Sequence, residues 1–280
     1  MLRLAVQKSG RLHDDSLKLL KECGITIENG KDQLRVRARN FPLDVYYLRN
    51  GDIPKYLQDG VVDCAIIGEN LLVEKAPELE ARIKLGFSKC RVALAIPKND
   101  NFNGISDLEG KQIATSYPNT LQQFLDKNHI EASIHQINGS VEIAPNIGLS
   151  DGIMDIVSTG STLFKNNLKE VVSIMDSQAV LAVRPGMADD NLSELCFRIE
   201  SVLKARNYRY VLLNAPNESL DKICSILPGM KSPTILPLAD ANWSSVHSVL
   251  PKQDFWELIS KLKKAGAQGV LVCPIEKMVI

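Results

Sequence analysis

The sequence predicts an α/β protein with two similar lobes followed by a smaller C-terminal domain. Three observations lead to this fold class: a motif that occurs twice, strands and helices that alternate around each copy, and a different alternation after residue 205. The 280 residues are enough for more than one domain. A composition of 45% hydrophobic and 24% charged residues is typical of a soluble globular chain.

The repeated motif is LxDGxxDxxxxGxxL. It fits LQDGVVDCAIIGENL at residues 57–71 and LSDGIMDIVSTGSTL at residues 149–163 without a gap. In each copy we expect a helix to end near the Asp-Gly pair, where glycine takes a left-handed conformation, and a buried strand of about four or five residues to follow. This match aligns Asp63 with Asp155.

The likeness extends upstream of both copies. Each copy is preceded by a strand, a loop, a helix, a second strand and a second helix. In the first copy we expect strand 3–7, helix 13–22, a strand ending near Leu48 and helix 53–58. In the second copy we expect strand 111–116, helix 121–128, a strand ending near Ile137 and helix 141–149. Residues 25–40 are extra in the first copy. They predict an inserted β-hairpin with Asn29-Gly30 as its turn.

The C-terminal part has its own pattern. After a helix around residues 193–205, it predicts strand 208–214, helix 219–227, strands 234–238 and 246–250, helix 255–265 and strand 269–274. This βαββαβ order is that of a ferredoxin-like domain. It lacks a cluster of charged residues, which argues against catalysis there.

Parallel sheets bind ligands beyond the carboxyl ends of their strands. The loops at those ends are QKSGR, LRNGD and IGEN in the first lobe, and SYPN, INGSVE and STGST in the second. The strands CRVALAIP and AVLAVRP would join the lobes, so that the six loops face each other across one cleft.

The STGST loop has the composition of a phosphate site. Successive backbone N–H groups at a helix N-terminus, flanked by hydroxyls and opened by one glycine, can enclose a phosphate. The loop lacks the GKS or GKT ending of a nucleotide triphosphatase. A serine- and threonine-rich turn that caps a helix is the alternative. The residues of this candidate loop are Ser158, Thr159, Gly160, Ser161 and Thr162.

Two acidic residues strengthen the phosphate hypothesis. Asp155 and Glu142 would lie near the same strand ends, where carboxylates could accept hydrogen bonds from the 2- and 3-hydroxyls of a ribose 5-phosphate. We interpret Asp151 as a solvated helix end and Asp63 as a structural residue.

Cations are expected on the opposite wall. Lys8, Arg11 and Arg49 come from two strand ends of the first lobe and could contact a pyrophosphate or triphosphate. Tyr117 offers either a stacking face for a base or ordinary packing.

Charge and composition exclude several classes. Thirty-three basic residues balance thirty-three acidic ones, so no overall positive field attracts nucleic acid or anionic lipid. No apolar run reaches membrane-spanning length, and the N-terminus does not resemble a signal peptide, which favours a cytoplasmic protein. The six cysteines and four histidines are scattered, which fits reduced core thiols and signals neither a metal site nor a Cys/His dyad.

Several stretches together resemble the long form of ATP phosphoribosyltransferase, the first enzyme of histidine biosynthesis. They are AVQKSGRL, DGVVDCAIIGEN, CRVALAIP, IATSYPNTL, NGSVEIAP, DIVSTGSTL, PTILPLA and PIEKM, and they cover essentially the whole chain. The resemblance implies a catalytic unit like the periplasmic binding proteins, with lobe I at residues 1–90 and 178–205 and lobe II at 91–177. An ACT-like regulatory domain at 206–280 would follow.

The resemblance also implies the reaction and the roles of residues. Phosphoribose would pass from phosphoribosyl pyrophosphate to N1 of ATP with Mg²⁺, releasing pyrophosphate. Asp155 would lie near the ribose, residues 158–162 on its phosphate, and Glu142 near the ribose or Mg²⁺. The pyrophosphate and ATP wall would comprise Lys8, Arg11, Arg49, Glu69 and Asn70, with Tyr117 beside the adenine.

Regulation is implied in the same way. Histidine would inhibit the enzyme at the C-terminal domain, and the family forms dimers and hexamers, so a homo-oligomer is expected. The candidate histidine residues are Asp221, Ser232, Thr234 and Leu238. Two other functions remain open from the residues: a non-catalytic receptor for small anions, since such folds often only bind ligands, and an amino-acid sensor, which would leave the cleft unexplained.

Overall fold

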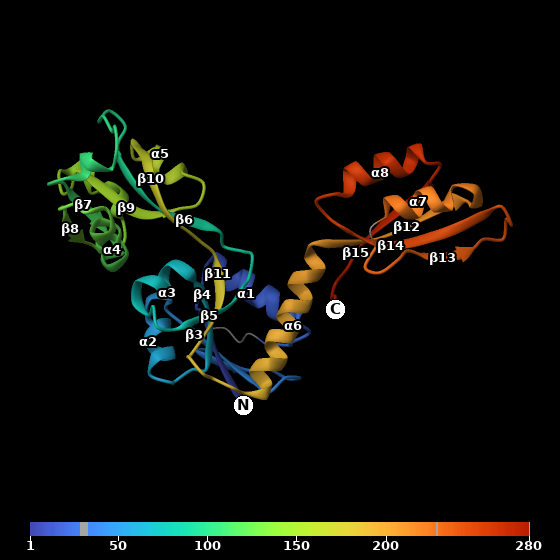
Figure 1. The fold of residues 1–280 in the computed structure, drawn as a ribbon. Helices are drawn as coiled ribbons and strands as arrows, with labels where there is room; N and C mark the ends of the chain where they lie inside the picture. Colours follow the sequence, from blue (N-terminus) through green and yellow to red (C-terminus); the bar gives the residue numbers. More distant parts are fainter. Residues whose placement is uncertain (29–32, 228, 280) are drawn as a thin grey trace. The chain divides into compact units, whose positions relative to one another are not determined.

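The computed structural model describes residues 1–28, 33–227 and 229–279. The chain forms two compact units, residues 1–193 and 194–280. The boundary between the units falls within helix α6 (Asp190–Arg206), whereas the sequence placed it after residue 205. The first unit contains two sheets and the second unit contains one (Figure 1).

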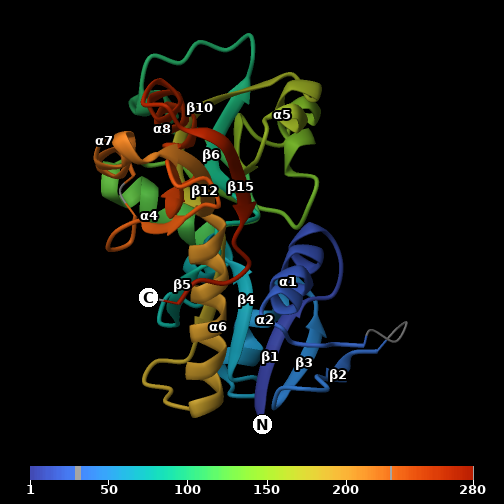
Figure 2. The same ribbon diagram turned by 90° about the vertical axis from the view of Figure 1, so that its right-hand side faces the viewer.

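The first sheet forms lobe I. Its order is β2-β3-β1-β4-β11-β5, in which β1 is parallel to both β3 and β4. Figure 2 shows β2, β3, β1 and β4 side by side. The strands are β1 (Leu2–Gln7), β2 (Arg35–Arg37), β3 (Leu43–Leu48), β4 (Cys64–Gly68), β5 (Glu80–Lys84) and β11 (Ala179–Val183), and the helices are α1 (Arg11–Glu22), η1 (Asn50–Asp52), α2 (Ile53–Gln58) and α3 (Glu69–Lys75).

The second sheet forms lobe II, in the order β10-β6-β9-β7-β8. Its strands are β6 (Cys90–Pro97), β7 (Gln112–Thr115), β8 (Ser133–Gln136), β9 (Gly152–Val157) and β10 (Leu168–Ser177), and its helices are η2 (Ile105–Leu108), α4 (Pro118–Asn128), η3 (Val141–Ile143), η4 (Pro145–Ile147) and α5 (Ser161–Lys165). Each sheet contains three parallel strands, and next to them lies one antiparallel strand from the chain that links the lobes. This strand is β11 in lobe I and β6 in lobe II. The predicted repeat is therefore a repeat of topology.

The register of the repeat differs from the ungapped sequence match. Asp63 and Asp151 make the same contacts: the N–H of Asp63 donates to the Arg3 carbonyl at 2.8 Å and its Oδ2 accepts from the Arg3 N–H at 2.9 Å. The N–H of Asp151 donates to the Gln112 carbonyl at 2.8 Å and its Oδ2 accepts from the Gln112 N–H at 2.8 Å.

These contacts make Asp151, and not Asp155, the structural counterpart of Asp63. The strand pairs agree, because Leu4 faces Cys64 and Ile113 faces Gly152. The alignment from the sequence was therefore wrong by four residues, and the lobe I counterpart of Asp155 is the buried Ile67.

Two local predictions were also wrong. Instead of a helix over 141–149, two short 3₁₀ turns form, because Pro145 begins a new turn and Gly148 ends it at φ +72°. The left-handed stop predicted at Gly152 is thus taken by Gly148. In the inserted segment, β2 pairs antiparallel with β3, which follows it, so among the described residues the hairpin lies downstream of the predicted one. The predicted turn at 29–30 lies outside the described residues.

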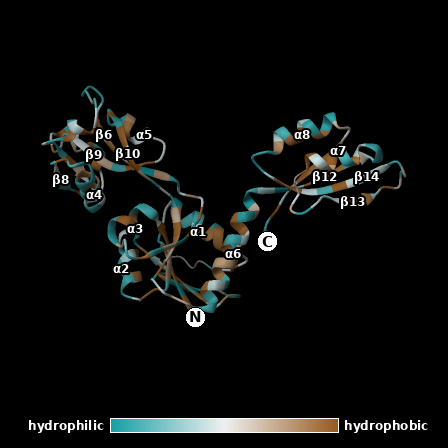
Figure 3. Cartoon of the chain, in the orientation of Figure 1, coloured by the Kyte–Doolittle hydropathy of each residue, from teal (hydrophilic) through white to brown (hydrophobic). Residues whose placement is uncertain are grey.

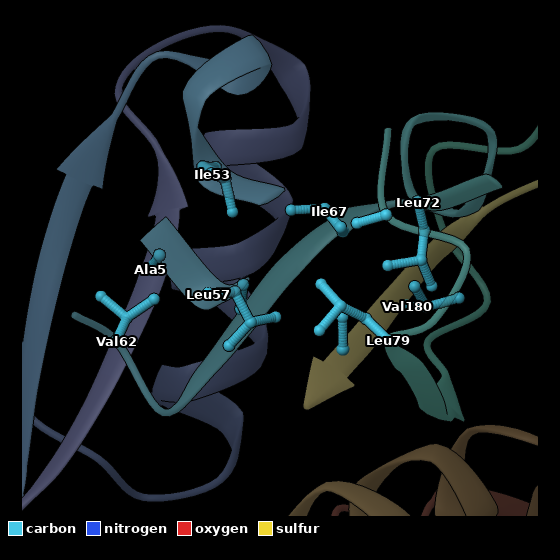
Figure 4. Packing of buried hydrophobic residues seen from close by; sticks show 11 residues of the cluster. Ala5, Ile53, Leu57, Val62, Ile67, Leu72, Leu79 and Val180 are labelled. Carbon is cyan, nitrogen blue, oxygen red and sulfur yellow. The ribbon is translucent and has the colours of Figure 1, made fainter. Parts of the chain in front are cut away.

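One apolar core cluster of lobe I lies between the sheet and helices α2 and α3. Buried side chains from β1, β4 and β11 meet buried side chains of both helices (Figure 4). Lobe II has an apolar cluster on each face of its sheet. Figure 3 shows hydrophobic residues concentrated along the strands and on one side of several helices. Rigid, filled cores of this kind fix the strand ends from which the loops extend.

The C-terminal unit confirms the predicted ferredoxin-like order. Its sheet runs β13-β14-β12-β15, and its elements are β12 (Tyr208–Pro216), η5 (Asn217–Ser219), α7 (Leu220–Ile226), β13 (Thr234–Pro237), β14 (Trp243–Pro251), α8 (Phe255–Lys264) and β15 (Gln268–Pro274). Both helices pack on the same face of the sheet, around Val211, Leu213 and Val246. No helix within the described ranges is long and apolar enough to cross a membrane.

Candidate active site

Three loops of lobe II lie at one edge of its sheet. β7 is parallel to both β8 and β9, so the loops SYPN, INGSVE and STGST leave the sheet at the same end. The Ser116 hydroxyl donates a 2.7 Å hydrogen bond to the carbonyl of Ile137, which ties the first two loops together. The structure thus brings together the lobe II loops that the sequence singled out.

The STGST loop is short and open. Gly160 has φ +76°, and a Cβ at this position would meet no heavy atom within 4 Å. Thr159 Oγ1 donates to Ser161 Oγ at 3.1 Å, and the Ser161 N–H points to Thr159 Oγ1 at 3.5 Å. Ser158, Thr159, Ser161 and Thr162 are exposed. Helix α5 has only five residues, so it provides no long helix dipole. An anion would instead bind its free backbone N–H groups and hydroxyls.

Asp155 lies in the middle of β9, opposite Ala93 of β6. Burial raises the pKa of its carboxyl; the N–H of Ile156 donates to Oδ1 at 2.7 Å and opposes this rise, while the negative charge of Glu142 adds to it. Neither carboxylate forms an ion pair with a lysine, arginine or histidine of the described ranges. Two neighbouring acidic groups without a cation favour a positively charged or hydroxyl-rich ligand.

Tyr117 follows β7 and is half-buried near Asp155. Burial and then the charge of Asp155 raise the pKa of its phenol. The Asn70 Nδ2 donates to the Tyr117 hydroxyl at 3.2 Å. Asn70 comes from the GEN segment of lobe I, so the structure brings these two predicted residues of different lobes into contact.

The GEN segment is held by a buried hydrogen-bond pair. The Asn70 N–H donates to Ser177 Oγ at 3.0 Å, and the same hydroxyl donates back to Asn70 Oδ1 at 2.9 Å. Gly68 permits this arrangement, because a Cβ there would lie 2.4 Å from Asn70 Oδ1. Glu69 forms an ion pair with Lys84 at 3.0 Å.

Lys8 and Arg49 lie at neighbouring strand ends of lobe I. Gln7 and Leu48 pair at the ends of the parallel strands β1 and β3, and the N–H of Lys8 donates to the Leu48 carbonyl at 2.7 Å. Both cations are exposed. Arg11, at the start of α1, has an 82% exposed side chain with Asp15 at 4.0 Å. No ion pair or hydrogen bond joins these three cations to the STGST loop in the described part of the chain.

Two residues of this region were not singled out by the sequence. Ser177 ends β10 and anchors Asn70, and Glu74 of α3 binds the first turn of α4. The sequence does contain a signal that another part of the chain must cap α4. The helix begins at Tyr117-Pro118, and neither residue supplies the side-chain oxygen that usually accepts from the first N–H groups of a helix. Asp63, interpreted as structural, and Asp151, interpreted as a solvated helix end, both bind backbone N–H groups at strand starts. Asp151 therefore has the structural role that was predicted for Asp63 alone.

The four candidate histidine residues do not share one face of the C-terminal unit. Asp221 is exposed on α7, which packs on the core face of the sheet. Thr234 pairs with His247 of β14, and His247 in turn pairs with Leu212 of β12, so these three side chains lie on one face of the sheet. Leu212 stands between the core residues Val211 and Leu213, which point to the other face. Thr234 therefore lies on the face opposite the core. The other two candidates, Ser232 and Leu238, are exposed and half-buried, respectively.

Cysteines and possible metal ligands are dispersed. No disulfide joins the six cysteines, which all lie in the described ranges, and two of them are buried. Within the described ranges, no group of three or more histidine, cysteine, aspartate or glutamate side chains could hold a metal ion by itself.

Fold and site together define a two-lobed α/β protein, built like the periplasmic binding proteins, with two neighbouring carboxylates beside a hydroxyl-rich loop and with a ferredoxin-like domain. Residues 49–202 match the family described as ATP phosphoribosyltransferase, and residues 205–277 match its C-terminal domain. The chain therefore belongs to the ATP phosphoribosyltransferase family. It is an enzyme of the glycosyltransferase class in histidine biosynthesis.

Curated relatives match over the full chain. An ATP phosphoribosyltransferase of Cytophaga hutchinsonii is 52% identical over 282 residues, which is 100% of this chain and 99% of the relative. One from Phocaeicola vulgatus is 52% identical over 283 residues, with 100% of both chains covered.

Solved structures agree with the fold. A chain of an ATP phosphoribosyl transferase (HisG:HisZ) complex from Thermotoga maritima superposes with a TM-score of 0.64 at 30% identity, covering 73% of this chain and 99% of that one. A structure of Tv2483 bound to L-arginine has a TM-score of 0.50 at 18% identity, covering 74% of this chain and 84% of that one, and shares the fold alone.

Proposed function

We propose that this chain transfers the phosphoribosyl group of phosphoribosyl pyrophosphate to N1 of ATP, forming phosphoribosyl-ATP and pyrophosphate. The observation that carries the proposal is the pair of neighbouring carboxylates Asp155 and Glu142. Asp155 lies on β9, the strand that leads into the STGST loop, and neither carboxylate has a cation partner in the described ranges. The names of the full-length relatives support the reaction class.

The STGST loop would bind the 5-phosphate. The open space at Gly160 lets a phosphate oxygen approach the backbone N–H groups, and the exposed hydroxyls of Ser158, Thr159, Ser161 and Thr162 provide further donors. The hydrogen bond between Thr159 and Ser161 would be exchanged for bonds to the ligand.

Asp155 and Glu142 would act on the ribose. In the reaction, the lone pair of adenine N1 forms the new bond to C1 while the C1–O bond breaks and its electron pair leaves with pyrophosphate. The ribose carries positive charge in this displacement, as in glycosyl chemistry. A carboxylate held in a partly buried position stabilises such a charge more strongly than one in water, and the raised pKa of Asp155 reflects the same burial. No side-chain nucleophile is required.

The cations of lobe I would receive the phosphates. Lys8 and Arg49 lie at adjacent strand ends and are exposed, with Arg11 on the following helix. Their charges would stabilise the pyrophosphate leaving group and the ATP phosphates. Glu69 would act there indirectly, through Lys84, its ion-pair partner. Lobe closure would bring this wall to the ribose.

Mg²⁺ is the proposed cofactor. The neighbouring carboxylates of Glu142 and Asp155 fit a hard cation that takes oxygen ligands and keeps several of them from water and substrate phosphates. Glu142 would hold it together with the substrate. When bound, the ion would neutralise charge on the pyrophosphate.

Tyr117 would border the adenine. Its hydroxyl is fixed by Asn70, so the ring is held at the junction of the lobes rather than free to rotate. The adenine would therefore lie between the GEN segment and the carboxylates of lobe II.

The C-terminal unit would bind histidine as a feedback inhibitor. The Thermotoga chain, matched over 99% of its length, covers 73% of this one, so this chain has additional residues to carry such a domain. Because Asp221 and Thr234 lie on opposite faces of the sheet, a single histidine molecule would contact only one of them within one chain. A cytoplasmic homo-oligomer, as dimer and hexamer, completes the proposal.

One assay tests the reaction. Purified protein is mixed with ATP, phosphoribosyl pyrophosphate and Mg²⁺, and the ultraviolet absorbance of N1-substituted adenine is followed. We expect product to form and histidine to slow its formation. Tight binding of phosphoribosyl pyrophosphate with no product under any condition would instead indicate a small-anion receptor.

A further inference from the structure

Helix α4 begins without a cap from its own sequence. Its N-cap residue is Tyr117, with Pro118 at the first helical position, and no side chain of this turn accepts from the helix. The first N–H groups of a helix have no partner within it and must find acceptors elsewhere. This matters for the site because Tyr117 belongs to the loop proposed to border the adenine.

Glu74 of α3 supplies the missing acceptors. Its Oε1 accepts from the Asn119 N–H at 3.0 Å, and its Oε2 accepts from the Thr120 N–H at 2.8 Å and the Thr120 hydroxyl at 2.7 Å. The Asn119 side-chain amide donates to the Glu74 carbonyl at 2.9 Å. Glu74 is only 4% exposed, so these bonds are shielded from water. A carboxylate at a helix N-terminus is also favoured by the helix dipole.

The same face of α3 holds both ends of the Tyr117 segment. Asn70 lies four residues before Glu74 and therefore on the same side of the helix. Asn70 donates to the Tyr117 hydroxyl, while Glu74 binds the backbone of residues 119 and 120. Asn70 is itself fixed by Ser177, and both residues are buried. Lobe I thus determines the position of a loop that is covalently part of lobe II.

We propose that Glu74 is a positioning residue for ATP: by holding the first turn of α4, it fixes Tyr117 beside Asp155. The inference rests on the proposed function. The STGST loop lies after β9 and makes no hydrogen bond with Glu74 in the described part of the chain. Loss of Glu74 therefore affects ATP far more than phosphoribosyl pyrophosphate. A merely structural carboxylate would affect both substrates alike.

The test is Glu74→Gln, which keeps the size of the side chain but turns an amide NH₂ toward N–H donors. We expect binding of ATP to weaken about tenfold, which corresponds to about 1.4 kcal/mol. Binding of phosphoribosyl pyrophosphate should stay within about threefold, since its contacts are untouched. Calorimetry with each ligand measures both. In kinetics, the KM for ATP should rise, whereas the KM for phosphoribosyl pyrophosphate should stay nearly unchanged.

Hydrogen exchange provides a readout without substrate. At least one of the amides of residues 119 and 120 should exchange faster in Glu74→Gln, because glutamine keeps only one of the two acceptor oxygens that bind them. If wild-type protein forms no product, the proposed reaction fails, but the exchange and ATP-binding measurements still decide the role of Glu74. Unchanged exchange, or equal losses for the two ligands, would overturn the proposal.

Two further variants guard against general destabilisation. Asp63→Asn alters another buried carboxylate that binds a backbone N–H, but within lobe I and away from the site. It should lower the melting temperature without favouring one ligand over the other. Thr120→Val removes only the hydroxyl bond to Glu74 and should weaken ATP binding about threefold, in the same direction.

Discussion

The two lobes of the first unit share a strand order but differ in what they do with their acidic residues. In lobe I, Asp63 is bound by Arg3 through a backbone N–H and the guanidinium, with Arg184 at 3.5 Å. Its lobe II counterpart Asp151 makes the same backbone contact, with Lys111 at 3.7 Å. Both serve to join the starts of neighbouring strands.

Asp155 has no such structural duty. Its lobe I counterpart is Ile67, which is fully buried, and its neighbours are another carboxylate and an open hydroxyl-rich loop. The comparison teaches that both lobes keep one topology, while one strand position holds a buried isoleucine in lobe I and a carboxylate in lobe II. Under the proposed function, ligand binding would depend on this carboxylate, which has no ion-pair partner in the described ranges, and not on the repeated motif itself.

The largest expected effect comes from removing that charge. Asp155→Ala should lower kcat/KM about 1,000-fold, or about 4 kcal/mol of transition-state stabilisation, because the developing positive charge on the ribose loses its carboxylate. The fold should persist, since no salt bridge is broken. Steady-state kinetics and circular dichroism measure the two effects. Near-normal turnover would remove Asp155 from the site.

Placing the same charge in lobe I should damage the fold instead. Ile67→Asp puts a carboxylate among fully buried apolar residues of β4 and should cost about 3 kcal/mol or more of unfolding free energy. Urea unfolding compares it with Ile67→Val, which should cost about 1 kcal/mol. Equal stability of the two variants would show that the lobes tolerate charge alike.

Gly160→Val tests the open loop. A β-branched residue at φ +76° is strained, and its side chain would occupy the space left for the phosphate. We expect binding of phosphoribosyl pyrophosphate to weaken at least about 30-fold, or about 2 kcal/mol. Gly148→Val is the matched control, because Gly148 also has a positive φ of 72° and open surroundings but lies outside the loop. The same loss in both variants would argue for strain alone.

The pH dependence of stability should have opposite signs at the two aspartates. Burial opposes the charge of Asp63, but hydrogen bonds and the charge of Arg3 outweigh it and lower its pKa. Its stabilisation is therefore complete above about pH 3.9, the unfolded value, and is lost as the pH falls through the folded pKa. Asp63→Asn should cost about 1 kcal/mol at neutral pH and less in acid.

For Asp155 the sign is reversed. Its raised pKa means that the ionised form disfavours folding above the folded pKa, and that this penalty disappears as the pH falls through that value toward the unfolded one. Asp155→Asn should therefore raise the melting temperature at neutral pH, with the gain shrinking in acid. Melting curves over a pH series measure both variants. A loss of stability in Asp155→Asn would contradict the assignment of an uncompensated charge.

The sequence could predict the parts of the molecule that depend on local pattern. The C-terminal elements, the three parallel strands of each lobe and the clustering of three lobe II loops all follow from hydrophobic periodicity and turn residues. The register of the repeat could not be predicted, because the ungapped match paired Asp63 with Asp155 while backbone hydrogen bonds pair Asp63 with Asp151. Side chains that repeat in sequence need not repeat in position.

Contacts between distant elements were the other gap. Glu74 reads as an ordinary acidic residue in a helix, and only the fold places it against the uncapped start of α4, 45 residues away. Likewise, Ser177 gives no sign in the sequence that it fixes Asn70, 107 residues away. Pro145 inside a predicted helix was a local signal that the helix would break.

The most direct test of the account uses ribose 5-phosphate, which carries the sugar and its phosphate without the pyrophosphate. Titrated by calorimetry, it should bind wild-type protein and Lys8→Met equally, because all its proposed contacts come from lobe II. It should fail to bind Gly160→Val, because its phosphate needs the open loop. Binding that survives in Gly160→Val, or that is lost in Lys8→Met, would contradict the claim that lobe II holds the phosphoribosyl group.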